Sequence, residues 1–216
     1  MTTPDAPRRR GRPPKLTREA VLAAALEVLD ESGHDGLSMR AVAERLGVGK
    51  MSLYHHVADR AELERLLIER LLAELDVPDA ALPWRERISA LAHSVRSLVI
   101  RHPNATPLVA LREYSDPASL RLPEAVMLAL RDAGLSGVAL VGGSRLVFSY
   151  AIGFAQIDLI AREDGSDAVS PMASLSAAEF PNIVAGARLT RGLSFDDQFE
   201  LGLQPLLAGL AAMATA

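Results

Sequence analysis

The sequence predicts an all-α protein with a small helical head near its N-terminus and a larger helical body behind it. Three observations predict this fold class. Apolar residues recur at three- and four-residue spacing in one segment after another. Glycine and proline separate these segments where helices are expected to end. No strand-like alternation of apolar and polar residues extends over a convincing length.

The composition is that of a globular protein. The chain has 216 residues, of which 49% are hydrophobic, so one large domain or a small and a larger one can bury a core. It has no cysteine, which excludes disulfides, thiolate metal ligands and cysteine nucleophiles. The arginine-rich N-terminus is not followed by the apolar stretch of a secretory signal, so we expect a cytoplasmic protein.

The charge is distributed unevenly. Six arginines and lysines in residues 1–18 face one aspartate, giving +5 there and leaving −9 for the other residues of a chain with net charge −4. Residues 1–15 are rich in proline, arginine and glycine, with almost nothing to bury, so we predict a disordered basic arm. A basic arm on an acidic body suggests a polyanionic partner.

The head is predicted over residues 16–60 as three helices. The first begins after Thr17, an N-cap residue, and ends at Gly33. Ser38 caps a second helix, which ends at Gly47. A tight glycine-containing turn then leads to a very short third helix over about residues 50–56.

A connecting helix within residues 61–78 joins the head to the body, residues 79–216. Asp59 and Glu62 form a D-x-x-E capping pattern at its start, and prolines mark its end. Every periodic segment of the body is predicted to be helical. The predicted body helices cover residues 84–101, 104–111, 122–133, 138–161, 175–187 and 195–213.

The segment 138–161 is long and apolar enough to be compared with a membrane span. Arg145, Gln156 and Asp158 interrupt it, and several glycines and serines lower its hydropathy. We therefore interpret it as a buried helix and expect no membrane partner.

The stretch GVGKMSLYHHV, residues 47–57, concentrates chemically active side chains. His55 and His56 are adjacent, so on a helix they diverge by about 100°, and no further ligand is suitably spaced nearby. We expect no metal and no cofactor here. Ser52 and His56 could touch, but the sequence provides no orienting carboxylate, so we expect no catalytic site either.

Two short helices joined by a tight turn form a helix-turn-helix, whose second helix enters the DNA major groove. Leu53 and Val57 can anchor that helix to the core of the head. The residues left facing outward are Lys50, Met51, Ser52, Tyr54 and His55, with Arg40 and Arg60 on either side. The alternative is that these residues form a solvated turn, but a solvated turn does not explain why these residue types occur together.

The run LSMRAVAERLGVGKMSLYHHVADRAEL resembles the DNA-binding head of the TetR (tetracycline-repressor) family of bacterial regulators. The matching elements are Ser38-Met39-Arg40, Ala43 to Val48, and Leu53 to Val57, and the resemblance covers about residues 15–75. It implies a homodimer that reads a pseudo-palindromic operator in double-stranded DNA. The resemblance also places Arg40, Lys50, Met51, Ser52, Tyr54, His56 and Arg60 at or near the DNA.

The arm contains RRRGRPPK, whose GRP core resembles an AT-hook. Arg10 and Arg12 would then lie in a narrow minor groove. The alternative is a basic tail that adds phosphate contacts without reading sequence. A minor-groove architectural protein that uses this arm is the second functional hypothesis.

The body resembles the tetracycline-repressor branch, notably in FDDQFELGLQPLLAGL at its end. The family pattern implies a four-helix dimer interface made by segments 138–161 and 195–213. Small residues such as Gly143, Ala151 and Gly153 would permit the close approach, although the same residues can pack within one subunit.

A small-molecule pocket would lie among the body helices. The candidates are apolar Leu91, Val95, Leu108, Met127 and Phe154, and polar Arg112 and Tyr150. Core packing predicts the same residues. Leu108 aligns with a histidine that holds the magnesium–drug chelate in tetracycline repressors, so we expect a more hydrophobic effector than tetracycline.

A helical enzyme is the last alternative, raised by His93 and His102. The sequence places no carboxylate at a triad-like or metal-like spacing from either histidine, so we expect surface or capping roles. The sequence as a whole predicts a homodimeric, ligand-responsive DNA-binding transcriptional regulator, most simply a repressor.

Overall fold

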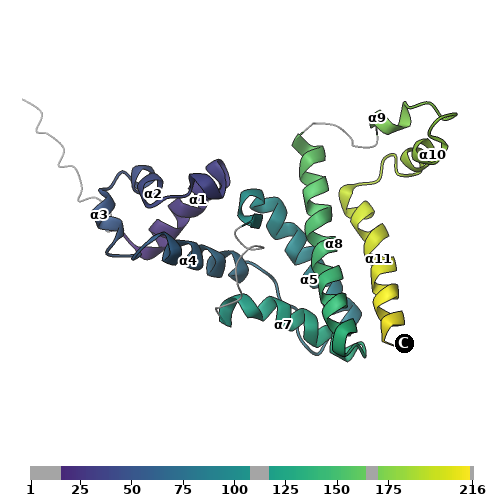
Figure 1. Cartoon of the computed structure of the whole chain (residues 1–216), viewed down its shortest axis with the longest axis horizontal. Helices are drawn as coiled ribbons and strands as arrows, with labels where there is room; N and C mark the ends of the chain where they lie inside the picture. Colours follow the sequence, from purple (N-terminus) through teal and green to yellow (C-terminus); the bar gives the residue numbers. More distant parts are fainter. Residues whose placement is uncertain (1–15, 108–116, 164–169, 215–216) are drawn as a thin grey trace, which may run out of the picture.

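The computed structural model describes residues 16–107, 117–163 and 170–214. All regular elements in these ranges are helices, which confirms the all-α prediction. Figure 1 shows the head at one end of an elongated molecule and the body at the other, with α4 running between them. One contiguous apolar core extends from the head through α4 into the body.

The head consists of α1 (Arg18–Gly36), α2 (Met39–Leu46) and α3 (Lys50–Leu53). The side chain of Thr17 accepts a hydrogen bond from the Ala20 amide at 3.1 Å, as predicted for an N-cap. Ser38 caps α2 in the same way. Gly33 leaves the helical conformation with φ of 69°, so the break predicted at Gly33 is present, and a last turn follows it within the bounds of α1.

The connecting helix is α4 (Arg60–Ala73). Asp59 accepts from the Glu62 amide at 2.8 Å, and the Glu62 carboxylate accepts from the Ala58 amide at 2.6 Å. The predicted capping pattern is therefore present, with Glu62 reaching one residue further back than in the standard capping box.

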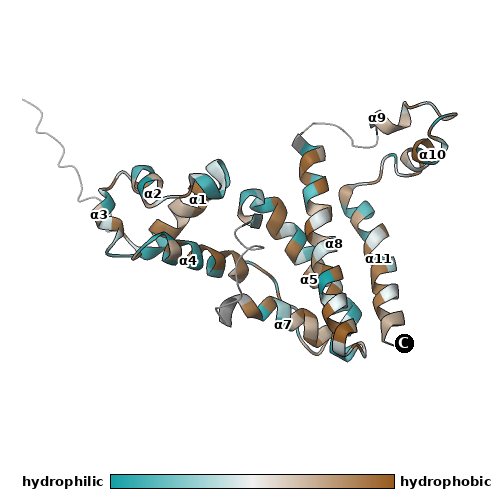
Figure 2. Cartoon of the chain, in the orientation of Figure 1, coloured by the Kyte–Doolittle hydropathy of each residue, from teal (hydrophilic) through white to brown (hydrophobic). Residues whose placement is uncertain are grey.

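The body comprises α5 (Trp84–Arg101), the 3₁₀ turn η1 (Pro103–Ala105), α7 (Pro117–Asp132), α8 (Gly137–Glu163), α9 (Ser170–Ala173), α10 (Pro181–Leu189) and α11 (Phe195–Met213). Helix α5 packs against both α7 and α8, and α8 packs against α11. Figure 2 shows apolar residues along much of α8.

Three predicted body helices differ from the structure. The helix expected over 122–133 begins already at Pro117. The helix expected over 175–187 is wrong, because the regular helix α10 begins only at Pro181. Proline has no amide hydrogen and is favoured in the first turn of a helix, where that hydrogen would have no partner within the helix. The helix expected over 104–111 begins as the 3₁₀ turn η1, and residues 108–111 lie outside the described residues.

Helix α8 is long and apolar enough to cross a membrane by length and composition alone. In the structure it belongs to the body and packs against α5, α7 and α11. Ala151, Ala155 and Asp158 are buried on its inner face. Its outer face keeps several apolar side chains exposed, among them Val138 and Ile160.

Candidate nucleic-acid interface and effector body

Helix α3 separates an anchoring face from an outward face, as predicted. Leu53 and Val57 are buried in the core. On the other side, the side chain of Met51 is 74% exposed and that of Tyr54 is 40% exposed. Lys50 and His55 are also exposed, and Ser52 and His56 are partly exposed. Figure 1 shows α3 at the end of the molecule farthest from the body, where a long ligand such as a DNA duplex has access.

The turn before α3 fixes its direction. Gly47 has a φ of 64°, a left-handed conformation that favours glycine, and it ends α2. The Val48 amide donates back to the Ala43 carbonyl at 3.0 Å. These contacts make the chain turn sharply, so that α3 leaves α2 after three residues.

Lys50 and Tyr54 lie close together on the outward face. The Lys50 Nζ atom lies 5.8 Å from the centroid of the Tyr54 ring, one helical turn away. The Lys50 cation therefore lies beside the Tyr54 side chain. Both groups suit the acceptors of phosphates and base edges.

The two flanking arginines are held by acceptors within the head. Arg40 donates to Glu44 at 2.8 Å, and this hydrogen bond raises the pKa of the exposed Arg40 guanidinium. Arg60 donates to Glu64 at 2.7 Å and to the His34 carbonyl at 3.1 Å. Phosphate contacts by either arginine would have to share or replace these partners.

The two arm residues predicted to contact DNA, Arg10 and Arg12, lie outside the described residues. The same holds for two of the predicted effector contacts, Leu108 and Arg112. Their roles stay predictions.

The other predicted effector residues lie on three helices that pack together. Leu91 and Val95 of α5 are buried, whereas Met127 of α7 is half-buried. Tyr150 and Phe154 of α8 are also half-buried. Since α5 contacts both α7 and α8, the structure brings these helices to one region of the body.

Tyr150 and Phe154 belong to an aromatic cluster that joins α8 to α11. The rings of Tyr150 and Phe154 lie 5.0 Å and 5.3 Å from the Phe199 ring, and His93 lies 4.8 Å from it. The Tyr150 hydroxyl donates to the Phe199 carbonyl at 2.5 Å. Burial raises the pKa of Tyr150, and the nearby Glu200 carboxylate raises it further.

A buried ion pair adjoins this cluster and was missed in the sequence. Arg96 donates to Asp158 at 2.7 Å and to Asp196 at 2.6 Å, and its guanidinium lies 5.0 Å from the Phe199 ring centroid. Asp158 is completely buried. The one sequence signal for this ion pair was Asp158, an acidic residue inside the apolar segment 138–161.

His93 is partly exposed and His102 is the C-cap of α5, as expected, and the tertiary structure adds a carboxylate partner for each. His93 Nε2 lies 2.5 Å from Glu200 Oε1, and His102 Nδ1 lies 2.9 Å from Asp30 Oδ2. These partners are 107 and 72 residues away along the chain, so local spacing could not reveal them. Within the described ranges, no group of three or more potential ligands could hold a metal ion.

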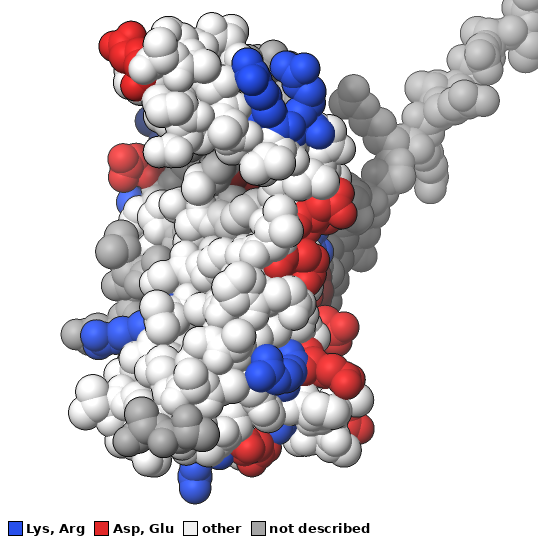
Figure 3. Space-filling model, turned by 90° about the vertical axis from the view of Figure 1, so that its right-hand side faces the viewer, with Lys and Arg blue, Asp and Glu red and all other residues white. Residues whose placement is uncertain are grey.

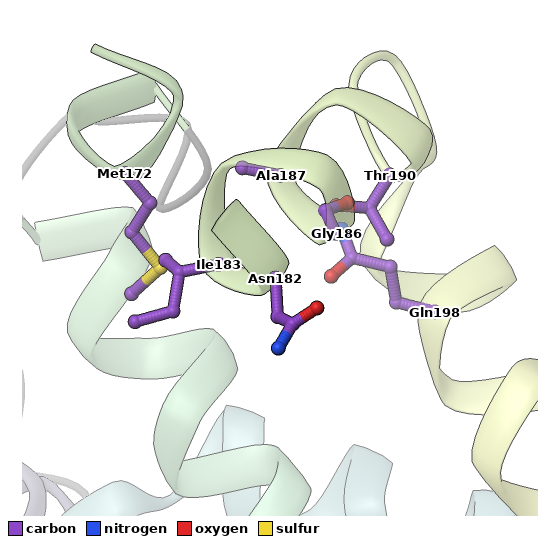
Figure 4. Close-up of a pocket in the computed structure, with 7 residues that line it drawn as sticks. All are labelled: Met172, Asn182, Ile183, Gly186, Ala187, Thr190 and Gln198. Atoms are coloured by element: carbon purple, nitrogen blue, oxygen red, sulfur yellow. The ribbon is translucent and has the colours of Figure 1, made fainter. Parts of the chain in front are cut away.

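A cavity of about 420 Å³ lies between α9, α10 and the start of α11. Its lining combines apolar and amide side chains, and Figure 4 shows Asn182 and Ile183 from α10 beside Met172 from α9. The full lining is Met172, Asn182, Ile183, Gly186, Ala187, Thr190 and Gln198. None of the predicted effector residues belongs to it, so it is separate from the predicted pocket.

The side of the body formed by α10 and α11 is poor in charge. Figure 3 looks onto this side and shows a broad uncharged surface, with most charged side chains toward its margins. Leu189 of α10 and Leu201 of α11 are exposed there. Helix α8 adds exposed Val138, Ile157 and Ile160. Exposed apolar side chains of this kind are typical of an interface between protein chains.

Both parts of the chain match known families. Residues 21–65 match the family described as bacterial regulatory proteins, tetR family. Residues 77–214 match the tetracyclin repressor-like C-terminal domain.

The similarity to known proteins extends over nearly the whole chain. An HTH-type transcriptional regulator of Saccharopolyspora erythraea is 32% identical, with 93% of this chain and 87% of that one covered. The HTH-type transcriptional repressor DrrR1 of Streptomyces coeruleorubidus is 32% identical, with 94% and 80% covered. Apo ActR of Streptomyces coelicolor superposes with a TM-score of 0.74 at 32% identity, with 93% and 97% covered. A structure of ActR in complex with actinorhodin superposes with a TM-score of 0.73.

Proposed function

Since this chain belongs to the TetR family of transcriptional regulators, we propose that it is a homodimeric repressor that a small hydrophobic effector releases from its operator. Its relatives are regulators and not enzymes, so the enzyme hypothesis is dropped. The protein would act in the cytoplasm, where its operator is.

The observation that carries the DNA-binding part is the division of α3 into two faces. Leu53 and Val57 fix the helix to the core, while Lys50, Met51 and Tyr54 remain outside. In a helix-turn-helix these outward positions enter the major groove. Lysine then donates to guanine, methionine contacts the thymine methyl, and tyrosine contacts a base or a phosphate.

Dimerisation would use the exposed apolar faces of α8 and α11, packed against the same faces of a second copy. Burial of Val138, Ile157 and Leu201 would remove apolar surface from water. A two-fold interface would place two copies of α3 on successive turns of a pseudo-palindromic operator.

The effector would bind among α5, α7 and α8, near Leu91, Met127 and Phe154. The apolar character of these side chains favours a hydrophobic, ring-containing compound. ActR, which resembles this chain along its length, has been solved with actinorhodin and with (S)-DNPA. Effector binding would favour a spacing of the heads that fits the operator poorly, and the operator would reduce effector affinity by the same factor.

Fluorescence anisotropy tests this proposal by measuring the affinity of the protein for the DNA upstream of its own gene. A scrambled duplex is measured in the same salt series as the control. We expect a preference for the native duplex of about 10³ or more. Tyr54→Ala should lower the specific affinity by about ten- to hundredfold, because it removes a base-side contact. Arg45→Ala is the matched control, since Arg45 is held by Glu27 and Glu31 within the head.

The outcomes separate the functional hypotheses. Specific binding that survives Tyr54→Ala unchanged would refute the role of α3. Equal and steeply salt-dependent binding to both duplexes would favour the architectural hypothesis instead. If specific binding is found, actinorhodin is the first compound to test for release of the duplex.

A further inference from the structure

A polar joint lies where the head meets the body, made by Asp30, Glu74, Arg101, His102 and Asn104. At its centre is His102, which directly follows α5. Its Nδ1 atom lies 2.9 Å from Asp30 Oδ2, on α1 of the head. Its Nε2 atom lies 3.4 Å from Glu74 Oε2, at the end of α4. One imidazole therefore contacts the head, the connecting helix and the body.

Two further contacts brace the joint. The Asn104 amide, on η1, donates to the backbone carbonyl of Asp30 at 2.7 Å. Arg101, in the last turn of α5, lies 3.0 Å from the same Glu74 oxygen that faces His102. The His102 side chain is only 14% exposed, so these contacts are partly shielded from water and are stronger than free surface pairs.

The number of hydrogens on the imidazole decides how many of these contacts are attractive. A neutral imidazole has a single N–H, whereas a protonated one has two. Only the protonated ring can therefore donate to Asp30 and at the same time hold a positive charge 3.4 Å from Glu74. In the neutral ring one bare nitrogen faces a carboxylate. The charged groups around His102 are Asp30 from α1, Glu74 from the end of α4 and, through Glu74, Arg101 from α5.

From this geometry we infer that His102 is a positioning residue whose protonation sets how tightly the head is held against the body. The joint closes as pH falls, because the ring then carries a positive charge between the Asp30 and Glu74 carboxylates. It loosens as pH rises, because one of the two contacts is lost. The reading helix α3 moves with the head, so the state of the joint changes the presentation of α3 to DNA.

The link to DNA rests on the proposed function, but the movement itself does not, and it can be measured without DNA. The chain has no cysteine, so two introduced cysteines take spin labels at defined sites. Asp35→Cys in the head and Arg131→Cys in α7 both replace exposed residues. Pulsed electron paramagnetic resonance would give the distribution of distances between the label in the head and the label in the body. The labelled protein is diluted in unlabelled protein, so that only distances within one chain are recorded.

We expect the distance distribution to be narrower at about pH 5.5 than at about pH 8. In His102→Gln the response should be lost, because glutamine keeps one donor and one acceptor but takes up no proton. Asp30→Asn is the second variant and should also lose the response, since it removes the carboxylate that the ring faces in the head.

His93→Gln is the matched control. His93 is paired with a carboxylate too, but its partner Glu200 lies within the body, on α11. This variant should keep the full pH response. A response that survives in His102→Gln, a response lost equally in His93→Gln, or no response in the unsubstituted protein would each overturn the inference. Loss of specific operator binding at every pH would instead overturn the proposed function, and it would not affect the inference about His102.

Discussion

The buried pair of Arg96 and Asp158 is the interaction whose removal should cost the body most. Asp158 is completely buried, and it is held by Arg96 at 2.7 Å and by Arg162. Asp158→Ala would leave the guanidinium of Arg96 in the core without its buried counter-charge. Breaking one side of a buried ion pair costs about 3–5 kcal/mol of folding free energy.

The exposed partner of the same arginine provides the control. Asp196 also accepts from Arg96, at 2.6 Å, but its side chain is 80% exposed. Asp196→Ala should therefore cost only about 0–1 kcal/mol, because water replaces the lost carboxylate and salt screens it. The two variants remove the same chemical group from the same guanidinium and differ in burial, and Asp158→Ala also removes the carboxylate that Arg162 contacts.

Thermal unfolding at equal protein concentration measures the difference. For chains of this size 1 kcal/mol shifts Tm by about 2–4 °C, so Asp158→Ala should lower Tm by about 6–20 °C. A double variant, Arg96→Met with Asp158→Leu, should recover most of the loss, because apolar side chains of similar volume can replace a buried pair. Equal losses for Asp158→Ala and Asp196→Ala would refute the reasoning.

Two further predictions concern α11. A Cβ atom at Gly202 would lie 2.4 Å from the Tyr150 hydroxyl, so Gly202→Ala should destabilise the protein by about 1–3 kcal/mol in urea unfolding. Gly209→Ala, where nothing lies within 4 Å of the new atom, should not destabilise it. The hydrogen bond from Gln204 lowers the pKa of Glu200, and His93 lowers it further. The ionised Glu200 carboxylate therefore stabilises the fold above the usual carboxyl pKa of 4.5. This stabilisation is lost as pH falls through the lower pKa of the folded protein. Gln204→Leu should therefore reduce the difference in unfolding free energy between pH 7 and pH 3, and an unchanged difference would contradict this assignment.

Much of the head could be predicted from the sequence because its signals are local. Thr17, Ser38 and Asp59 cap helices through hydrogen bonds to residues three positions ahead. The anchoring of α3 by Leu53 and Val57 also follows from helical spacing. Such signals depend on a few neighbouring residues, so they can be recognised before the fold is known.

The body gave fewer local signals, and one of them was misinterpreted. Apolar residues at helical spacing indicated a helix over 175–187, but the position of Pro181 decided where α10 begins. The aromatic cluster around Phe199 was not predicted, although Tyr150 and Phe154 had been singled out as effector contacts. Their contact with α11 depends on how two helices far apart in the sequence pack together.

By itself the sequence determined the fold class, the capped helices of the head and the face that α3 turns outward. Only the tertiary structure decided which charges meet. Arg96 reaches Asp158 across 62 residues, and His102 reaches Asp30 across 72. Helix formation is set by interactions between residues three and four apart, whereas these pairs exist only because packing of the apolar faces brings distant helices together.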